Sequence, residues 1–237
     1  MTKKEEALAV ISMEDDANEG LATLSREDLA MPFFKITQPL TPEVVEGDLK
    51  PGMIMNSATG EAWTELEVVP CGYERQYIEW TPRETGGGLV AVHNQYEGPV
   101  LLATCTKNDK GKDVLPNGNL LVATAVHYVC ASIKGAPVLG IISMTSTNLK
   151  KSRRWNSVMT GIKLKGKNGV YTPPVYGHSY MAKVAKESNN FGTWYTWDVS
   201  LNKPVDDANL YNLCKGFNQE MSKGAVKVEH KSDDVPF

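Results

Sequence analysis

The sequence predicts a mainly β protein, in which a twisted antiparallel sheet closes into a small barrel with two or so helices. Three observations predict this α+β class. Many short apolar and β-branched segments alternate with turns rich in Gly, Pro and Asn. Only two segments change to a helical period. The strand–helix–strand rhythm of a parallel sheet is not visible, so a doubly wound fold is not expected.

The expected strands follow from apolar, β-branched runs bounded by turn residues. They fall within 51–63, 63–80, 86–93, 120–133, 136–145, 175–188 and 189–201. We expect 120–133 and 136–145 to form a central hairpin, because only Lys134 and Gly135 separate them. The last two segments are expected to form a second antiparallel pair around a polar turn.

Two helices are expected. In residues 146–164, Trp155, Val158, Met159 and Ile162 fall on one helical face, so Trp155 is expected in the core. Thr145, Ser146 or Thr147 can cap its start. The second helix is expected within 204–221, where Asp206 and Asp207 near the start favour the helix dipole.

The chain has 237 residues, 41% of them hydrophobic, which is enough for one body with a sizeable core. We place this single compact domain at residues 31–223, between a flexible acidic arm (1–30) and a flexible acidic tail (224–237). Because no run of about 18 apolar residues exists, no membrane span is expected. The four cysteines lack paired spacing, so neither a disulfide framework nor a metal site is predicted, and no cofactor is expected.

Charge is strongly segregated along the chain. The net charge is −3, yet residues 114–186 contain ten Lys or Arg and no Asp or Glu. The rest of the chain therefore carries a formal charge of −13. A segment of one sign attracts a polyanion at long range.

Aromatic residues occur beside these cations, and the combination is typical of a surface that holds single-stranded nucleic acid. Cations follow the phosphates, while aromatic faces stack on the bases. The candidate phosphate contacts are Lys150, Lys151, Arg153, Arg154, Lys163, Lys165 and Lys167, with Arg75 on an aromatic strand. The candidate stacking residues are Tyr73, Tyr77, Trp80, Trp194 and Trp197.

Signals for an enzyme are weak. No phosphate-binding loop of the G-x-x-x-x-G-K-[ST] type occurs. His127 and Cys130 are three residues apart on an expected strand, so they point to opposite faces as buried structural residues. Residues 114–186 contain no Asp or Glu, whereas a metal-dependent nuclease needs acids beside the bound nucleic acid. The sequence therefore predicts a protein without catalytic residues.

The last residues, SDDVPF, have the composition of a short docking peptide. Phe237 can fill an apolar pocket while Asp233 and Asp234 meet a basic rim, and Pro236 keeps the tip extended. This tip resembles that of bacterial single-stranded DNA-binding proteins, and the body resembles the larger single-stranded DNA-binding proteins of tailed phages. The body resemblance lies in MPFFKITQ, PGMIMNSATGE, the RRW helix and FGTWYTW.

The resemblance implies an OB-fold, a small Greek-key barrel, that coats single-stranded DNA in phage replication or recombination. It implies that Asp233, Asp234, Pro236 and Phe237 recruit replication or recombination proteins, and that the protein works in the bacterial host cytoplasm. Three alternatives stay open: a strand-annealing recombination protein, a nucleic-acid enzyme with acids from separated positions, and a structural or virion protein. The sequence leaves the oligomeric state open, including a homo-oligomer.

Overall fold

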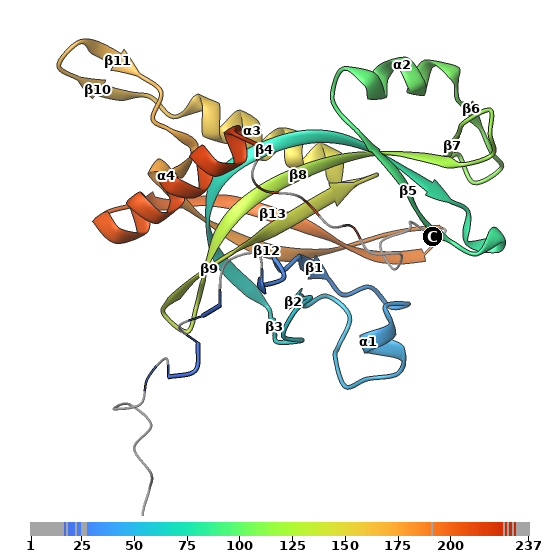
Figure 1. Ribbon diagram of the computed structural model, residues 1–237, viewed down its shortest axis with the longest axis horizontal. Coiled ribbons are helices and arrows are strands. Elements are labelled where there is room, and N and C mark those ends of the chain that lie inside the picture. The colour runs from blue at the N-terminus through green and yellow to red at the C-terminus, as the bar shows by residue number, and fades with distance from the viewer. Residues whose placement is uncertain are drawn as a thin grey trace, which may run out of the picture. The chain divides into compact units, whose positions relative to one another are not determined.

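A strongly curled antiparallel sheet is the centre of the fold (Figure 1). The computed structural model describes residues 17, 19–21, 23–24, 28–190, 192–224, 226, 228 and 230. Residues 1–30 and 31–237 are two separate units, and every named helix and strand belongs to the second. The prediction of a mainly β fold is confirmed, with the sheet curled into a half-barrel.

The main sheet has eight strands, all paired antiparallel. They are β4 (Glu65–Thr81), β5 (Gly88–His93), β6 (Thr106–Lys107), β7 (Asp113–Val114), β8 (Leu120–Ile133), β9 (Ala136–Thr145), β12 (His178–Asn189) and β13 (Gly192–Pro204). The order is β13-β12-β4-β8-β7-β6, while β5 pairs with β4 and β9 with β8. Both predicted hairpins, β8–β9 and β12–β13, are therefore confirmed.

A second, smaller sheet joins the two sides of the curled sheet. Its strands are β1 (Phe34–Ile36), β2 (Ile54–Asn56) and β3 (Ala62–Trp63). Just before β1, the carbonyl of Pro32 accepts from the Ile141 N–H of β9 at 2.9 Å. Just after it, the Gln38 side chain accepts from the Tyr195 N–H of β13 at 3.0 Å and donates to its carbonyl at 2.8 Å. Residues 32–38 therefore bridge β9 and β13.

Four helices are found in the described part of the chain, where the sequence predicted two or so. They are α1 (Pro42–Val45), α2 (Glu97–Thr104), α3 (Asn148–Gly161) and α4 (Ala208–Ser222), with two short 3₁₀ turns, η2 (Arg83–Thr85) and η3 (Val175–Gly177). The two predicted helices are α3 and α4. At α4 the Asp207 carboxylate caps the start, accepting from the Asn209 N–H at 2.7 Å and the Leu210 N–H at 3.1 Å. None of the described helices is long and apolar enough to cross a membrane.

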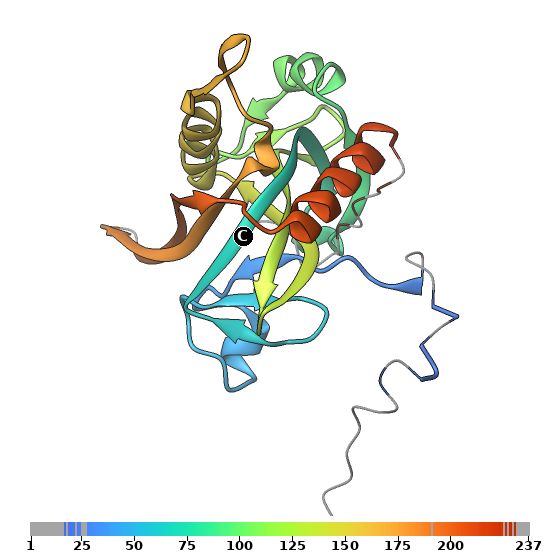
Figure 2. The same cartoon turned by 90° about the vertical axis from the view of Figure 1, so that its left-hand side faces the viewer.

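The helices α3 and α4 cover opposite faces of the sheet, which Figure 2 shows. On one face, Trp155 and Met159 of α3 pack with Ala125 and Val129 of β8. On the other face, Cys214 and Phe217 of α4 pack with neighbouring β8 residues, Val126, Tyr128 and Cys130. This alternation along β8 confirms that His127 and Cys130 face opposite sides.

Three of the described residues that follow α4 lie against the body. Val226 and Val228 pack against the α4 side of the core, and the His230 ring lies 3.1 Å from the Gln76 amide and 6.4 Å from the Trp80 ring centroid. Only 8% of His230 is exposed. These three positions thus contact the domain, although the sequence placed them in the tail that begins at residue 224.

A buried carboxylate fixes the end of the sheet at β5. Glu79 on β4 accepts from the Asn119 amide at 2.6 Å and the Asn117 amide at 2.9 Å, and lies 3.0 Å from His93 of β5. Desolvation raises the pKa of Glu79, but these hydrogen bonds outweigh it, so the pKa falls below its usual value. The stabilisation is therefore present above pH 4.5 and is lost as the pH falls through the folded-state pKa.

We expect Glu79→Gln to lower the free energy of unfolding at pH 7 by about 1–3 kcal/mol, because it removes the charge that strengthens the hydrogen bonds accepted by this buried side chain. Urea unfolding followed by circular dichroism measures this. Glu84→Gln is the matched control, since Glu84 is an exposed carboxylate that lies 3.5 Å from exposed Lys110. Equal stability of the two variants would contradict the assigned role of Glu79.

Candidate nucleic-acid interface

The buried face of α3 packs on the sheet through an aromatic stack. The Trp155 ring lies 4.3 Å from that of His127 on β8, nearly parallel at 18°, and 5.8 Å from that of Tyr180. His127 Nε2 lies 2.8 Å from the Ser152 hydroxyl of α3. Burial lowers the pKa of His127 to about 3, so its ring is neutral at pH 7. The prediction that Trp155 lies in the core is confirmed, at 1% exposure.

The outer face of α3 carries unpaired cations. Lys150, Arg153 and Arg154 are exposed, and within the described part of the chain they form no ion pair with a carboxylate. Ordinary surfaces intersperse charges of both signs, whereas a single-sign surface favours an anionic partner. These three side chains agree with the sequence prediction.

Lys151 is the exception on this helix. Its ammonium lies 2.7 Å from the Glu187 carboxylate of β12, and its side chain is only 26% exposed. The hydrogen bond from Lys151 is the main cause that lowers the pKa of Glu187. Lys151 is thus engaged inside the protein, so it is a weaker candidate for phosphate contact than the sequence indicated.

The start of α3 favours an anion. Its first turn contains Lys150 and Lys151 and no acid, and the N-cap residue Thr147 makes no side-chain capping bond. Cations near a helix N-terminus oppose the helix dipole and are usually destabilising by about 0.3–1 kcal/mol each. A bound phosphate would offset this destabilisation of the helix start, because helix N-termini and lysines both attract anions.

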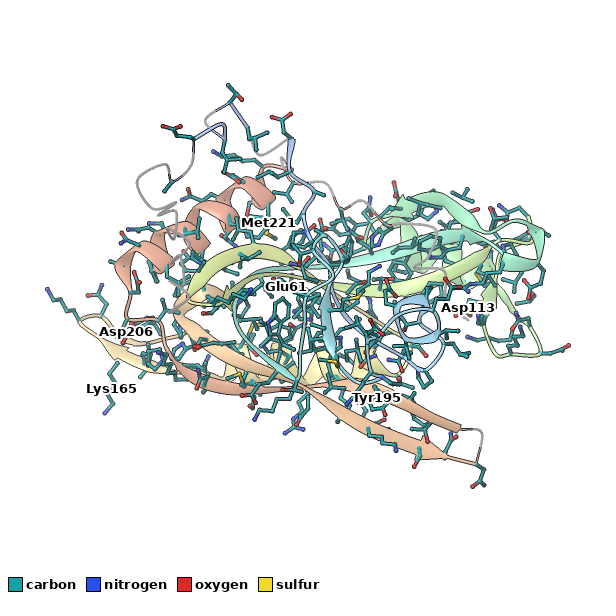
Figure 3. The ribbon with its side chains drawn as sticks, turned by 90° about the horizontal axis from the view of Figure 1, so that it is seen from below. Glu61, Asp113, Lys165, Tyr195, Asp206 and Met221 are labelled. Atoms are coloured by element: carbon teal, nitrogen blue, oxygen red, sulfur yellow. The ribbon has the colours of Figure 1, made fainter. Side chains whose placement is uncertain are left out.

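A β-hairpin follows α3 directly. Its strands are β10 (Leu164–Gly166) and β11 (Gly169–Tyr171), and Figures 1 and 2 show it extending beyond α3. Lys165 and Lys167 are exposed without a described carboxylate partner, and Figure 3 shows Lys165 pointing away from the body.

Lys163 is held at the base of this hairpin. Its ammonium donates to the Thr160 carbonyl at 3.1 Å and to the Thr172 hydroxyl. It is nonetheless exposed. We name the six outward cations of α3 and the hairpin the basic segment: Lys150, Arg153, Arg154, Lys163, Lys165 and Lys167.

Tyr171 is a candidate stacking residue outside the aromatic set expected from the sequence. It ends β11 opposite Leu164 and is 49% exposed. The Asn168-Gly169 turn, with Gly169 at φ +111°, was the signal for this hairpin. In this register the Tyr171 ring lies over Gly166 on the hairpin face of Leu164, while Lys165 points to the other face of the same hairpin.

A second aromatic side chain borders α3 on the sheet. Tyr73, Arg75 and Tyr77 alternate along β4 on the face that carries His127, as the sequence predicted. Tyr73 is 41% exposed, with its ring 5.1 Å from that of His127. Half-buried Arg75 lies 5.9 Å over the Tyr77 ring. Tyr73 and Arg75 therefore lie between two covered regions of this face. α3 covers the region on one side, and on the other side Gly98 of α2 covers Tyr77.

Three predicted stacking residues lie in the core instead. Trp80, Trp197 and Tyr77 are 1%, 2% and 9% exposed, and Trp194 is half-buried. Trp80 packs with Ile78 and Leu120, and Trp197 faces the cluster that contains Trp155. A base cannot stack on a ring whose faces are already covered. These burials contradict the roles assigned to the three residues and leave exposed Tyr73 and half-buried Trp194 from the original aromatic set.

The predicted partner-docking residues, Asp233, Asp234, Pro236 and Phe237, lie outside the described residues. Among the residues that are described, no three His, Cys, Asp or Glu side chains gather in a way that could hold a metal ion. The site that the structure describes therefore consists of the basic segment, Tyr171, Tyr73 and Arg75.

Comparison with known proteins gives one assignment. The chain matches no curated protein and no solved structure. Its residues 2–227, most of the sequence, match the profile of a phage family described as Pam3 phage gp34-like protein. The chain therefore belongs to the Pam3 phage gp34-like protein family.

Proposed function

We propose that this phage-family protein binds single-stranded DNA without sequence preference, as a non-catalytic coating protein in phage replication or recombination. The basic segment supplies sequence-independent contacts to phosphates, which dominate the affinity of such proteins. Tyr171 and Tyr73 supply exposed aromatic faces beside these cations, and Arg75 adds a further cation. Stacking contributes about 1–3 kcal/mol per base and tolerates every base.

One observation carries the proposal: six exposed cations without carboxylate partners, among the described residues, lie on consecutive elements next to two exposed tyrosines. A single strand is favoured over a duplex because its bases are free to stack on Tyr171 and Tyr73. The acidic tip remains a proposed docking peptide for replication or recombination proteins.

The hairpin gives the direct test. We expect Lys165→Gln/Lys167→Gln to weaken binding to labelled oligo(dT) about tenfold at low salt and to reduce the log–log salt slope by about 1.4, since each single-strand phosphate contact contributes about 0.7. Fluorescence anisotropy of an end-labelled oligonucleotide measures both. A label on the DNA is preferable because Trp80, Trp155 and Trp197 are buried.

Lys203→Gln/Lys215→Gln is the matched control, since it removes two exposed positive charges outside the basic segment. An abasic oligomer of equal length isolates stacking, and duplex DNA tests strand preference. Absence of wild-type binding at low salt would refute the proposal. Equal affinity for duplex and single strand would refute its single-strand part.

A further inference from the structure

The strand β5 is an edge of the main sheet. Among the described residues it pairs only with β4, against residues 77–81. Proteins usually protect such edges with Lys, Pro or inward charges, because free backbone groups pair readily with another strand. Here residues 86–96 contain no Asp, Glu, Lys, Arg or Pro. The edge therefore lacks protective charges and prolines, although it contains a β-bulge opposite Glu79 and Trp80, a feature that can twist an edge away from a partner.

Large apolar side chains are exposed on this edge. The exposed fractions of Leu89, Val90 and Val92 are 41%, 50% and 42%. Further along the same charge-poor segment, Tyr96 is 77% exposed and Val100 68%. Single exposed apolar residues are common, but several in one segment mark an interaction site.

The register makes β5 self-complementary. A bulge places Leu89 opposite Trp80 and Val92 opposite Ile78, so Leu89 and Val92 point to the same face although they are three residues apart. In an antiparallel pair of β5 with its own copy, centred between Val90 and Ala91, each Leu89 would face Val92 of the second copy. Apolar residues would thus meet apolar residues at both ends of the pair.

We propose that β5 pairs edge to edge with β5 of a second copy of this chain, around a two-fold axis. The occupant is a second copy because an antiparallel strand pair is the isologous arrangement, in which one surface serves both partners. Residues 86–96 are uncharged, so two copies meet without the repulsion that the basic segment would cause. The strand (6 residues) and the following helix (8 residues) together contain 14 residues, fewer than the roughly 20–30 a side of a standard interface, so we expect a weak dimer.

The pairing leaves the basic segment free. α3 packs on His127 and on the strands β9 and β13, whereas β5 pairs with the other end of β4. A dimer would therefore carry two basic segments, and binding of one strand by both would raise the apparent affinity by avidity. Self-association itself does not depend on DNA binding, so each can fail without the other.

Sedimentation equilibrium of the full chain without DNA, at about 1–100 µM, tests the proposal. We expect a monomer–dimer equilibrium for the wild type. Val92→Lys places an ammonium group against Leu89 of the second copy, where pairing would desolvate the charge, and should raise the dimer dissociation constant at least about tenfold. Val45→Lys is the matched control, since Val45 is 63% exposed on α1, and it should leave the constant unchanged.

Hydrogen exchange of the wild-type protein is a second test, and it requires no variant. Outward-facing amides of β5 should exchange slowly at high protein concentration and rapidly after dilution. A monomer at every concentration would overturn the proposal, as would a Val92→Lys variant that folds and dimerises like the wild type. Concentration-independent exchange of β5 would also overturn it.

Discussion

Arg153→Glu/Arg154→Glu should weaken binding of single-stranded DNA about 100-fold at low salt. Both guanidinium groups are exposed on α3 and lack a described carboxylate partner, so their charge is free for a phosphate. The change removes two contacts and adds two repulsive charges, and each tenfold loss corresponds to about 1.4 kcal/mol. Anisotropy with oligo(dT) across a salt series measures it.

Lys203→Glu/Lys215→Glu is the control for this experiment, because it changes the net charge by the same amount through exposed residues of β13 and α4. If the field of the whole protein drove binding, both variants would lose affinity equally. Equal losses would therefore contradict a localised site on α3. Circular dichroism melts of both variants establish that the fold is retained.

Acidification should destabilise the protein through His127, with an effect of about 2 kcal/mol at pH 5 and about 4–5 kcal/mol near pH 3. Burial lowers the folded-state pKa from its ordinary 6.5 to about 3. Between these values the unfolded chain binds the proton and the folded protein does not. Stability therefore falls as the pH drops below 6.5, and the contribution levels off below about pH 3.

His127→Gln isolates this effect. The variant loses the aromatic stack on Trp155, which is a cost independent of pH, but it removes the titration. The difference in free energy of unfolding between wild type and variant should shrink as the pH falls from 7 to 4, measured by urea unfolding. A difference that stays constant over this range would contradict a buried neutral His127. Because His127 packs against α3, protonation of His127 should also weaken the packing of the helix that carries Arg153 and Arg154.

Local sequence patterns determined much of the fold. Alternating apolar residues on both sides of Lys134–Gly135 specified the β8–β9 hairpin, and the spacing of Trp155 and Met159 specified the buried face of α3. Asp207 marked the start of α4. These features depend on neighbours close in the chain, so periodicity and capping chemistry suffice to predict them.

The sequence by itself also determined the charge segregation that defines the candidate site. Only the tertiary structure decided which of its residues are open to a ligand. Glu187 of β12 forms an ion pair with Lys151. Trp80 is covered by Leu120 and His230, which are distant from it in the sequence. An alternating pattern of apolar and polar residues predicts that the two faces of a strand differ in polarity. It does not predict burial in this sheet, because packed elements cover both faces where the sheet curls. Burial is a sum over contacts distant in sequence, so no local pattern can separate a core tryptophan from a stacking one.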